Sequence, residues 1–473
     1  MARLKIEAWD TFKLAVPMMI GQVSVHLTQV IDAAMIGRVG VNELAAAAFA
    51  SNFYMLFLMS GFGISVALSV HIAGAFGKGE TAEQRDYLAA GIISLIAFGL
   101  CLACGMHFVL PLADMMGQPE VVLLHARSYL LLLGWSTAPV LVMAGLKGAC
   151  ESINKPWFPM LYTIGVLPLN AFLNWVLIYG NLGFPAMGLD GAGIATLLSR
   201  VVMIIWLWRD LGKQQFFGKP FSLFELLSRG FKKSWELLKM GVATGLQITF
   251  EVASFNGAAI MMGWIGAAAL AAHQIAINLV GLIFMIPLAL SFAVSIRVGQ
   301  ALGSNNREKA RDIGLANAGV TFWLMTLSAT AIWIFKDPLV AIFIGRDVAD
   351  AAVVLEAGAL FLSIAALFQI GDGLNIILMG FLRGYRDVQV PTIISFFVFW
   401  CLGLPMAFFL AFGGDSISET MPDVFRDAAK WGVGLGGVGI WIALAIVLFL
   451  SASVMAIRAR VTVRRSNSIN EIP

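Results

Sequence analysis

Long apolar runs follow one another along almost the whole chain, separated by short polar turns. Each run is about 20 residues or longer, the length that an α-helix needs to cross the roughly 30 Å apolar core of a bilayer. The turns contain glycine, asparagine and proline, which end helices. The pattern predicts about twelve membrane-spanning helices, near residues 14–36, 44–75, 87–112, 126–147, 157–180, 189–208, 235–264, 269–297, 310–335, 356–382, 391–413 and 432–457.

Composition supports this interpretation. Of the 473 residues, 59% are hydrophobic and 12% are charged, whereas a soluble protein carries roughly 25% charged residues. The N-terminal segment is charged and leads into a full-length span, without the short apolar core and small-residue cleavage site of a signal peptide. We therefore expect an all-α polytopic membrane protein.

The basic residues predict the orientation of the spans. Cytoplasmic loops of membrane proteins are enriched in Lys and Arg, and alternate connections of this chain hold most of its 31 basic residues. These connections lie on one side if both termini are cytoplasmic and the number of spans is even. The cytoplasmic set includes Arg297, Arg383 and Arg386, whereas Arg127 and Arg200 fall within helices.

An internal repeat relates the two halves of the chain. A shift of 226 residues superposes them without a gap, and it places Lys13 on Lys239, Gly37 on Gly263, Gly77 on Gly303, and Asp86 on Asp312. Six spans in each half make two parallel repeats, related by a pseudo-twofold axis along the membrane normal. We expect an N-terminal six-helix lobe at 1–212, a cytoplasmic linker at 213–234, a C-terminal six-helix lobe at 235–458 and a cytoplasmic tail at 459–473. We further expect substrate to bind between the lobes, with alternating access.

Three acidic residues fall inside predicted spans: Asp32, Glu251 and Asp372. An ionisable side chain is costly in hydrocarbon and is a functional hypothesis by default. The repeat places Glu251 opposite Val25 and Asp32 opposite Ala258, so the shared fold does not require either acid. Each carboxylate either binds a coupling cation or exchanges protons, or it makes a polar contact between helices.

Other polar residues in the spans have two interpretations each. Arg200 either pairs with an acid or extends its stem toward the cytoplasmic interface. Asn170 and Asn174 share one helix face, where they present amides to a polar interior or join helices together. His273 is either a proton carrier or, as we favour, an interhelical contact.

Several classes of protein lack support in the sequence. No HExxH motif, paired intramembrane His or GxSxG within a span points to an intramembrane enzyme, and no GxxxxGK[ST] points to ATP hydrolysis. The loop GKGETAEQRD does not match the basic motif of the major facilitators, and acids confined to single lobes fit a channel poorly. We expect no cofactor other than a coupling ion, no metal other than a coupling cation, and no nucleic-acid partner.

Six stretches, in order, carry a family resemblance: LAVPMMIG with VIDAAMIGRVG, LNAFLNWVLIYGNLGFPAMGLDGAGIAT, FEVASFNGAAIMMGWIGAAALAAHQIAIN, SIRVGQALG and FLRGYRDVQVPT. Over essentially its full length the chain resembles the multidrug and toxic compound extrusion (MATE) family. FEVASF, together with an Asp eleven residues before the Arg of LRGY, resembles the NorM-like branch. The chain departs from the family pattern where LKGACES replaces the usual LRG…D run, leaving Glu151 there.

The resemblance implies an antiporter of the bacterial inner membrane, which exports organic and usually cationic compounds in exchange for Na⁺ or H⁺. It implies a cation site at Glu251 and Asp372, and proton or substrate coupling at Asp32, Asn170 and Asn174. We expect a monomer surrounded by lipid. The alternative is an exporter or flippase of an endogenous metabolite or a lipid-linked substrate on the same fold.

Overall fold

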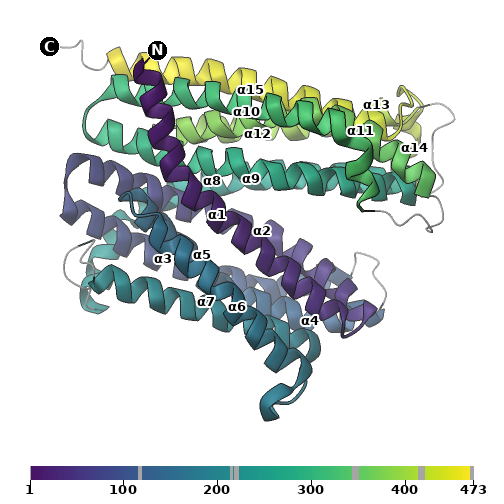
Figure 1. Cartoon of the computed structure of the whole chain (residues 1–473), viewed down its shortest axis with the longest axis horizontal. Helices are drawn as coiled ribbons and strands as arrows, with labels where there is room; N and C mark the ends of the chain where they lie inside the picture. Colours follow the sequence, from purple (N-terminus) through teal and green to yellow (C-terminus); the bar gives the residue numbers. More distant parts are fainter. Residues whose placement is uncertain are drawn as a thin grey trace. The chain divides into compact units, whose positions relative to one another are not determined.

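The computed structural model describes residues 2–114, 120–213, 217, 223–343, 351–413 and 421–468. In this part of the chain all regular structure is helical (Figure 1). The helices are α1 (Ala2–Gly37), α2 (Val41–Lys78), α3 (Thr81–Asp114), α4 (Glu120–Trp135), α5 (Thr137–Ser152), α6 (Trp157–Tyr179), η1 (Asn181–Gly183), α7 (Gly188–Lys213), α8 (Leu223–Ile265), α9 (Ala267–Gly303), α10 (Arg307–Ala341), α11 (Ala351–Gly384), α12 (Gln389–Phe396), η2 (Phe397–Gly403), α13 (Leu404–Ala411), α14 (Asp423–Ala429) and α15 (Gly437–Ser468).

Eleven candidate membrane spans are present in the described residues, and the bent pair α4 and α5 makes a twelfth if it counts as one span. This confirms the predicted all-α polytopic fold. The stretch predicted as the end of the linker belongs to α8, which begins at Leu223 and continues unbroken to Ile265.

Two predicted spans depart from a regular α-helix close to a proline. The span expected at 126–147 is α4 followed by α5, bent by 40° at Ser136. Pro139 lies in the first turn of α5 and has no N–H to donate to the carbonyl of Trp135, so the helical ladder breaks there. The span expected at 391–413 contains the π-helical turn η2 before Pro405 at the start of α13.

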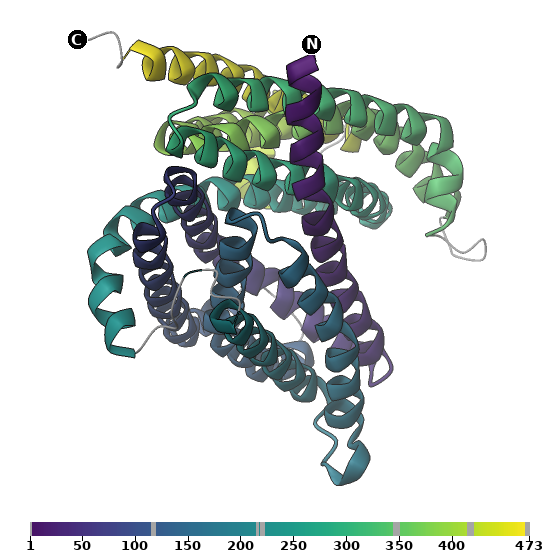
Figure 2. The same cartoon turned by 60° about the vertical axis from the view of Figure 1, so that its left-hand side comes forward.

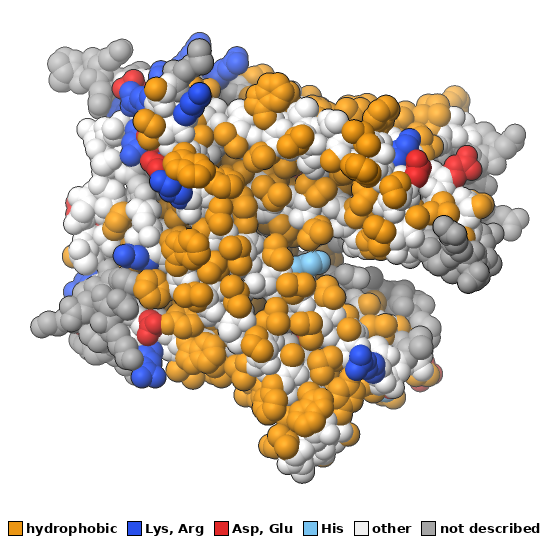
Figure 3. Space-filling view, in the orientation of Figure 1, with side chains coloured by type: hydrophobic (Ala, Val, Ile, Leu, Met, Phe, Trp, Pro, Cys, Tyr) orange, Lys and Arg blue, Asp and Glu red, His pale blue; other side chains and the backbone are white. Residues whose placement is uncertain are grey.

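Large apolar side chains cover the outer surface. Leu124, Trp323, Leu327 and Leu367 are each 60–70% exposed, and they belong to helices that meet the length and hydropathy of a membrane span. On the face shown in Figure 3, hydrophobic side chains dominate the middle of the helices, while Lys, Arg, Asp and Glu gather toward the helix ends. Apolar patches of this extent are rare on soluble monomers, and they agree with the candidate membrane spans.

The chain forms two compact units. Unit 1 contains Met1–Thr11, Gln247–Val298 and Arg307–Pro473, and unit 2 contains Phe12–Leu246 and Gly299–Asn306. In unit 1, α11 packs against α10 on one side and α15 on the other, and the three helices run side by side (Figure 1, Figure 2). In unit 2, α2 packs against α3, α4 and α5, and α6 packs against α7.

The repeat is visible in a helix crossing within unit 2. A Cβ added at Gly77 of α2 would meet the backbone of Gln300, and one added at Gly303 of α9 would meet the backbone of Gly74. The 226-residue shift exchanges Gly77 with Gly303 and Gly74 with Gln300. The two contacts are therefore equivalent, and each needs glycine because backbone lies where a side chain would stand.

Two ion pairs are also related by the 226-residue shift. Arg3 of α1 pairs with Asp312 of α10 in unit 1, with 3.0 Å between Nε and Oδ2. Arg229 of α8 pairs with Asp86 of α3 in unit 2, with 2.7 Å between Nη1 and Oδ1. Arg3 corresponds to Arg229 and Asp312 to Asp86 under the shift, so the first helix of each repeat starts with the same ionic contact.

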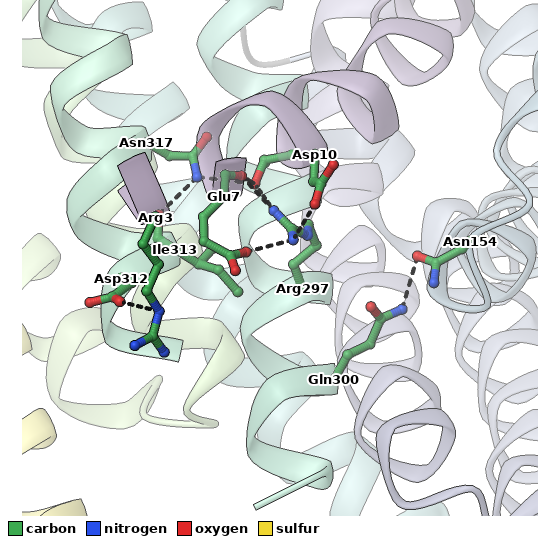
Figure 4. Close-up of polar contacts among 10 residues, drawn as sticks. Arg3, Glu7, Asp10, Asn154, Arg297, Gln300, Asp312, Ile313 and Asn317 are labelled. Atoms are coloured by element: carbon green, nitrogen blue, oxygen red, sulfur yellow. Dashed lines mark hydrogen bonds and ion pairs between the residues drawn. The ribbon is translucent and has the colours of Figure 1, made fainter. Parts of the chain in front are cut away.

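A buried ionic network holds the first residues of α1 against α9 (Figure 4). Arg297 Nη2 lies 2.7 Å from Glu7 Oε2, and Nη1 donates to the Glu7 carbonyl and to Thr11 Oγ1 at 2.5 and 2.7 Å. Asn317 also donates to Thr11 Oγ1, at 3.0 Å. Arg297 is 9% and Glu7 7% exposed, so this arginine is a buried structural tie and not a solvated base.

The glycine crossing gives a first prediction. Gly77→Val and Gly303→Val should each destabilise the protein by about 1–3 kcal/mol, because two backbones in contact must separate. The melting temperature in detergent measures this, with Gly281→Val of α9 as the control, since a Cβ at Gly281 meets nothing within 4 Å. Equal melting temperatures for all three variants would contradict the close crossing.

The buried network gives a second prediction. Arg297→Met should destabilise the protein by about 3–5 kcal/mol, because it leaves the Glu7 carboxylate buried without its charged partner. Lys430→Met is the control, since Lys430 pairs with Asp427 on an exposed helix and should leave the melting temperature unchanged. Similar thermal stability of the two variants would show that the Arg297 tie contributes little.

Candidate functional site

The two acids predicted for the C-terminal lobe lie together in unit 1. Glu251 comes from α8 and is 8% exposed, and Asp372 comes from α11 and is 5% exposed. The two carboxyl groups are close enough to interact electrostatically. Both lie in candidate spans, so the structure holds two buried acids of one charge sign next to each other within the apolar part of the protein.

One face of α11 continues from Asp372 with a buried amide and a buried base. Asn375, Met379 and Arg383 follow at intervals of three or four residues, which in an α-helix places them on one stripe. Asn375 is fully buried; its Oδ1 accepts a hydrogen bond from Ser451 Oγ of α15 at 2.8 Å. Its side chain also lies close to Glu251. This stripe places an amide beside the acids.

The acids keep unused hydrogen-bonding capacity. Glu251 Oε1 and Asp372 Oδ1 are buried and have no hydrogen-bond partner in the described residues. Burying an unsatisfied carboxylate oxygen is costly, and either a proton or a monovalent cation would remove that cost. Carboxylate and amide oxygens are the hard ligands that such cations use. Among the described residues no group of three or more His, Cys, Asp and Glu could hold a metal ion.

The burial of Arg383 differs from what the sequence predicts. The sequence places it among the cytoplasmic bases, but its side chain is only 1% exposed and interacts electrostatically with Glu251. Its guanidinium carbon lies 5.9 Å from the centre of the Phe292 ring of α9, an arrangement typical of a cation–π contact. The end of α11 is covered by α9, and this covering takes Arg383 out of solvent.

The residues predicted for the N-terminal lobe lie together in unit 2. Asn174 Nδ2 of α6 donates to Asp32 Oδ1 of α1 at 2.5 Å, and also lies 3.2 Å from Asn170 Oδ1. Thr196 of α7 also lies near Asp32. Asn170 and Asn174 are almost completely buried, while Asp32 is half-buried. Neutral polar groups of α6 and α7 thus lie beside the carboxylate of α1.

Arg200 of α7 belongs to this second cluster. It interacts electrostatically with Asp32, and its Nη1 donates to Ser136 Oγ at 2.6 Å. Ser136 is the residue at which α4 and α5 bend. Of the two interpretations of Arg200, the electrostatic interaction with Asp32 favours a contact with an acid, while the hydrogen bond of Arg200 goes to the hydroxyl at the helix break.

His273 stands apart from both clusters. Its ring packs 5.5 Å from the ring of Trp441 of α15, in a core that includes Phe361 and Phe368. Nδ1 has no hydrogen-bond partner in the described residues. The ring of His273 thus makes an apolar packing contact between α9 and α15.

Sequence reasoning did not select Asn375, Ser451, Thr196 or Ser136. Asn375 could have been selected from the sequence, because it is a polar residue one turn after Asp372 in an apolar run. Arg383 could also have been placed on the face of Asp372, since the eleven residues between them make three helical turns. Ser and Thr are common in membrane helices as backbone-bonded residues, and nothing in the sequence distinguishes the ones that contact an acid.

An all-helical protein with eleven to twelve spans and a buried carboxylate cluster in each unit belongs to the class of polytopic membrane transporters. The MatE family model matches residues 17–176 and 244–409, which is more than half of the chain. The chain therefore belongs to the MatE family, and it is an integral inner-membrane protein rather than an enzyme.

Curated relatives are similar in sequence to most of this chain, and solved structures share its fold. A probable multidrug resistance protein NorM of Bradyrhizobium diazoefficiens is 34% identical over 469 residues, covering 96% of this chain and 94% of the relative. The protein of the same name from Brucella suis is 30% identical, covering 95% and 92%. A mutant of the Vibrio cholerae MATE transporter VcmN has the same fold, with a TM-score of 0.84 at 19% identity and coverage of 98% and 99%. A eukaryotic MATE transporter gives a TM-score of 0.83 at 18% identity, also covering 98% and 99%.

The Asp32 cluster generates a prediction. In a double-mutant cycle, Asp32→Ala and Asn174→Ala should show a coupling free energy of about 0.5–3 kcal/mol in thermal stability, because the amide donates directly to the carboxylate. Asn181→Ala serves as the control partner, since its amide donates to the Trp175 carbonyl on an exposed turn. Additive effects of Asp32→Ala and Asn174→Ala would contradict the hydrogen bond.

Proposed function

We propose that this protein is a multidrug efflux antiporter, which exports organic and mainly cationic, amphipathic compounds in exchange for Na⁺ or H⁺. The two six-helix lobes would alternate access to the two sides of the membrane, with both termini in the cytoplasm and no prosthetic group. The relatives named as multidrug resistance proteins support the substrate class. The observation that carries the proposal is the pair of buried, incompletely hydrogen-bonded carboxylates of Glu251 and Asp372.

The chemistry of this pair supports ion coupling. A secondary antiporter needs a group that is neutralised by the entering ion and becomes charged again when the ion leaves. Glu251 Oε1 and Asp372 Oδ1 have the free lone pairs for this purpose, and the Asn375 amide lies near the Glu251 carboxylate. Both acids are buried, so the difference in free energy between the neutral and the charged state is large. That difference can favour one conformation of the protein over another.

The Asp32 cluster would serve proton or substrate coupling in the other unit. Asp32 is half-buried, accepts a hydrogen bond from Asn174 and lies near Thr196. An acid with neutral donors and partial exposure can exchange a proton with water or meet a cationic substrate. The bend at Ser136, contacted by Arg200, gives this cluster a mechanical connection to the α4–α5 pair.

The test is efflux of a fluorescent organic cation from proteoliposomes, with Na⁺ and pH gradients imposed separately. Glu251→Gln and Asp372→Asn should each reduce the ion-driven component by about tenfold or more, because each removes a charged ligand worth about 1.5–3 kcal/mol. Glu356→Gln, which alters an exposed acid on the same helix α11, should leave efflux unchanged. Undiminished ion-driven efflux in both site variants would overturn the assignment.

A further inference from the structure

Arg383 is a buried charge that the proposed cation site does not itself require. Its side chain is 1% exposed, and Nε, Nη1 and Nη2 have no hydrogen-bond partner in the described residues. A guanidinium carries five N–H donors and keeps its proton in proteins. A permanent positive charge in such a place is destabilising unless a negative group balances it.

The geometry of α11 directs this charge toward the acids. Arg383 lies on the same stripe as Asn375 and Asp372, and follows Asp372 by eleven residues, or about 16 Å along the helix. Long side chains in an α-helix lean toward its N-terminus, which for Arg383 is the direction of Asn375 and Glu251. Its electrostatic interaction with Glu251 agrees with this direction.

Helix α9 packs against α11 beside Arg383. Ser291 Oγ donates to the carbonyl of Ile376 at 2.7 Å, and a Cβ at Gly380 would meet Ser291. The next residue, Phe292, places its ring 5.9 Å from the Arg383 guanidinium. The tight packing of α9 on α11 thus encloses the arginine.

The enclosed groups have an uneven charge. The carboxylates of Glu251 and Asp372 contribute two negative charges, and Arg383 contributes one positive charge. The remaining single negative charge matches one monovalent cation or one proton. Without the arginine, the same carboxylates would form a buried dianion, which attracts a second cation or a divalent one.

We propose that Arg383 is a tethered counter-ion of the Glu251–Asp372 pair, which leaves this site with one net negative charge and so restricts it to a single monovalent cation. This inference rests on the proposed function, in which the carboxylate pair binds the coupling ion. Arg383 acts through the acids and is a positioning residue. When the transported cation departs, the guanidinium remains as the partner of Glu251, so the empty site is never an uncompensated dianion.

The counter-ion role is tested first without any transported ion. Thermal stability is measured in detergent at alkaline pH, in a buffer whose only cation is N-methyl-D-glucamine. Arg383→Met should lower the melting temperature, and the double variant Glu251→Gln with Arg383→Met should recover more than half of that loss, because both charges are then gone. Arg383→Lys should resemble the unaltered protein. The exposed Arg386 provides the control variant Arg386→Met, which should have no effect.

A double variant that is as unstable as the sum of its single changes would overturn the proposal, because a purely structural arginine is not rescued by removing an acid. This result does not depend on transport. If the double variant recovers but neither Na⁺ nor protons drive efflux, the counter-ion role stands and the proposed antiport is wrong.

The charge restriction is tested by cation titration of the same samples. Na⁺ should stabilise the unaltered protein, since a ligand that binds the folded state raises its melting temperature, and Ca²⁺ should not. Arg383→Met should bind Na⁺ about tenfold more tightly and should acquire stabilisation by Ca²⁺. Identical Na⁺ and Ca²⁺ responses in Arg383→Met and the unaltered protein would overturn the restriction to a single monovalent charge.

Discussion

The cost of burying charge in an apolar interior governs the polar architecture of this protein. Several ionisable groups that the fold removes from solvent lie beside groups that lower this cost. Glu7 lies against Arg297, Asp32 lies against Asn174 and Arg200, and Glu251 lies near Asn375 and Arg383. The apolar helices surround these polar clusters.

The clusters differ in how far their charged groups are hydrogen-bonded. Arg297 makes short hydrogen bonds with the side chain and carbonyl of Glu7 and with Thr11. The two charged side chains of this cluster therefore satisfy each other. By contrast, Glu251 and Asp372 each retain a buried oxygen without a partner in the described residues, and all three nitrogens of Arg383 do so as well. A carboxylate with an unused acceptor can take up a proton or a cation, which is what the proposed ion coupling requires.

Hydropathy and the 226-residue repeat were sufficient to predict the helical fold, because span length and glycine spacing are local properties of the sequence. They were also sufficient to select Glu251, Asp372 and Asp32, since an acid in an apolar run is conspicuous. They did not predict the burial of Arg383. A base at the end of a span looks solvated in the sequence, and only the packing of α9 over α11 shows that it is enclosed. Likewise, the sequence did not predict the bend at Ser136, where Pro139 removes a hydrogen bond between α4 and α5.

The symmetry of the repeat is kept at the helix ends and lost in the apolar midsections. Gly77 and Gly303 make equivalent contacts, and the Arg3–Asp312 pair matches the Arg229–Asp86 pair. The intramembrane chemistry does not follow this pattern, since Val25 stands in the place of Glu251 and Ala258 in the place of Asp32. Each unit nevertheless combines a carboxylate, an amide and an arginine, using residues that the repeat does not relate. Because no cluster shares a residue with the other, a substitution in one leaves the local environment of the other intact, so the contribution of each unit to ion coupling can be measured separately.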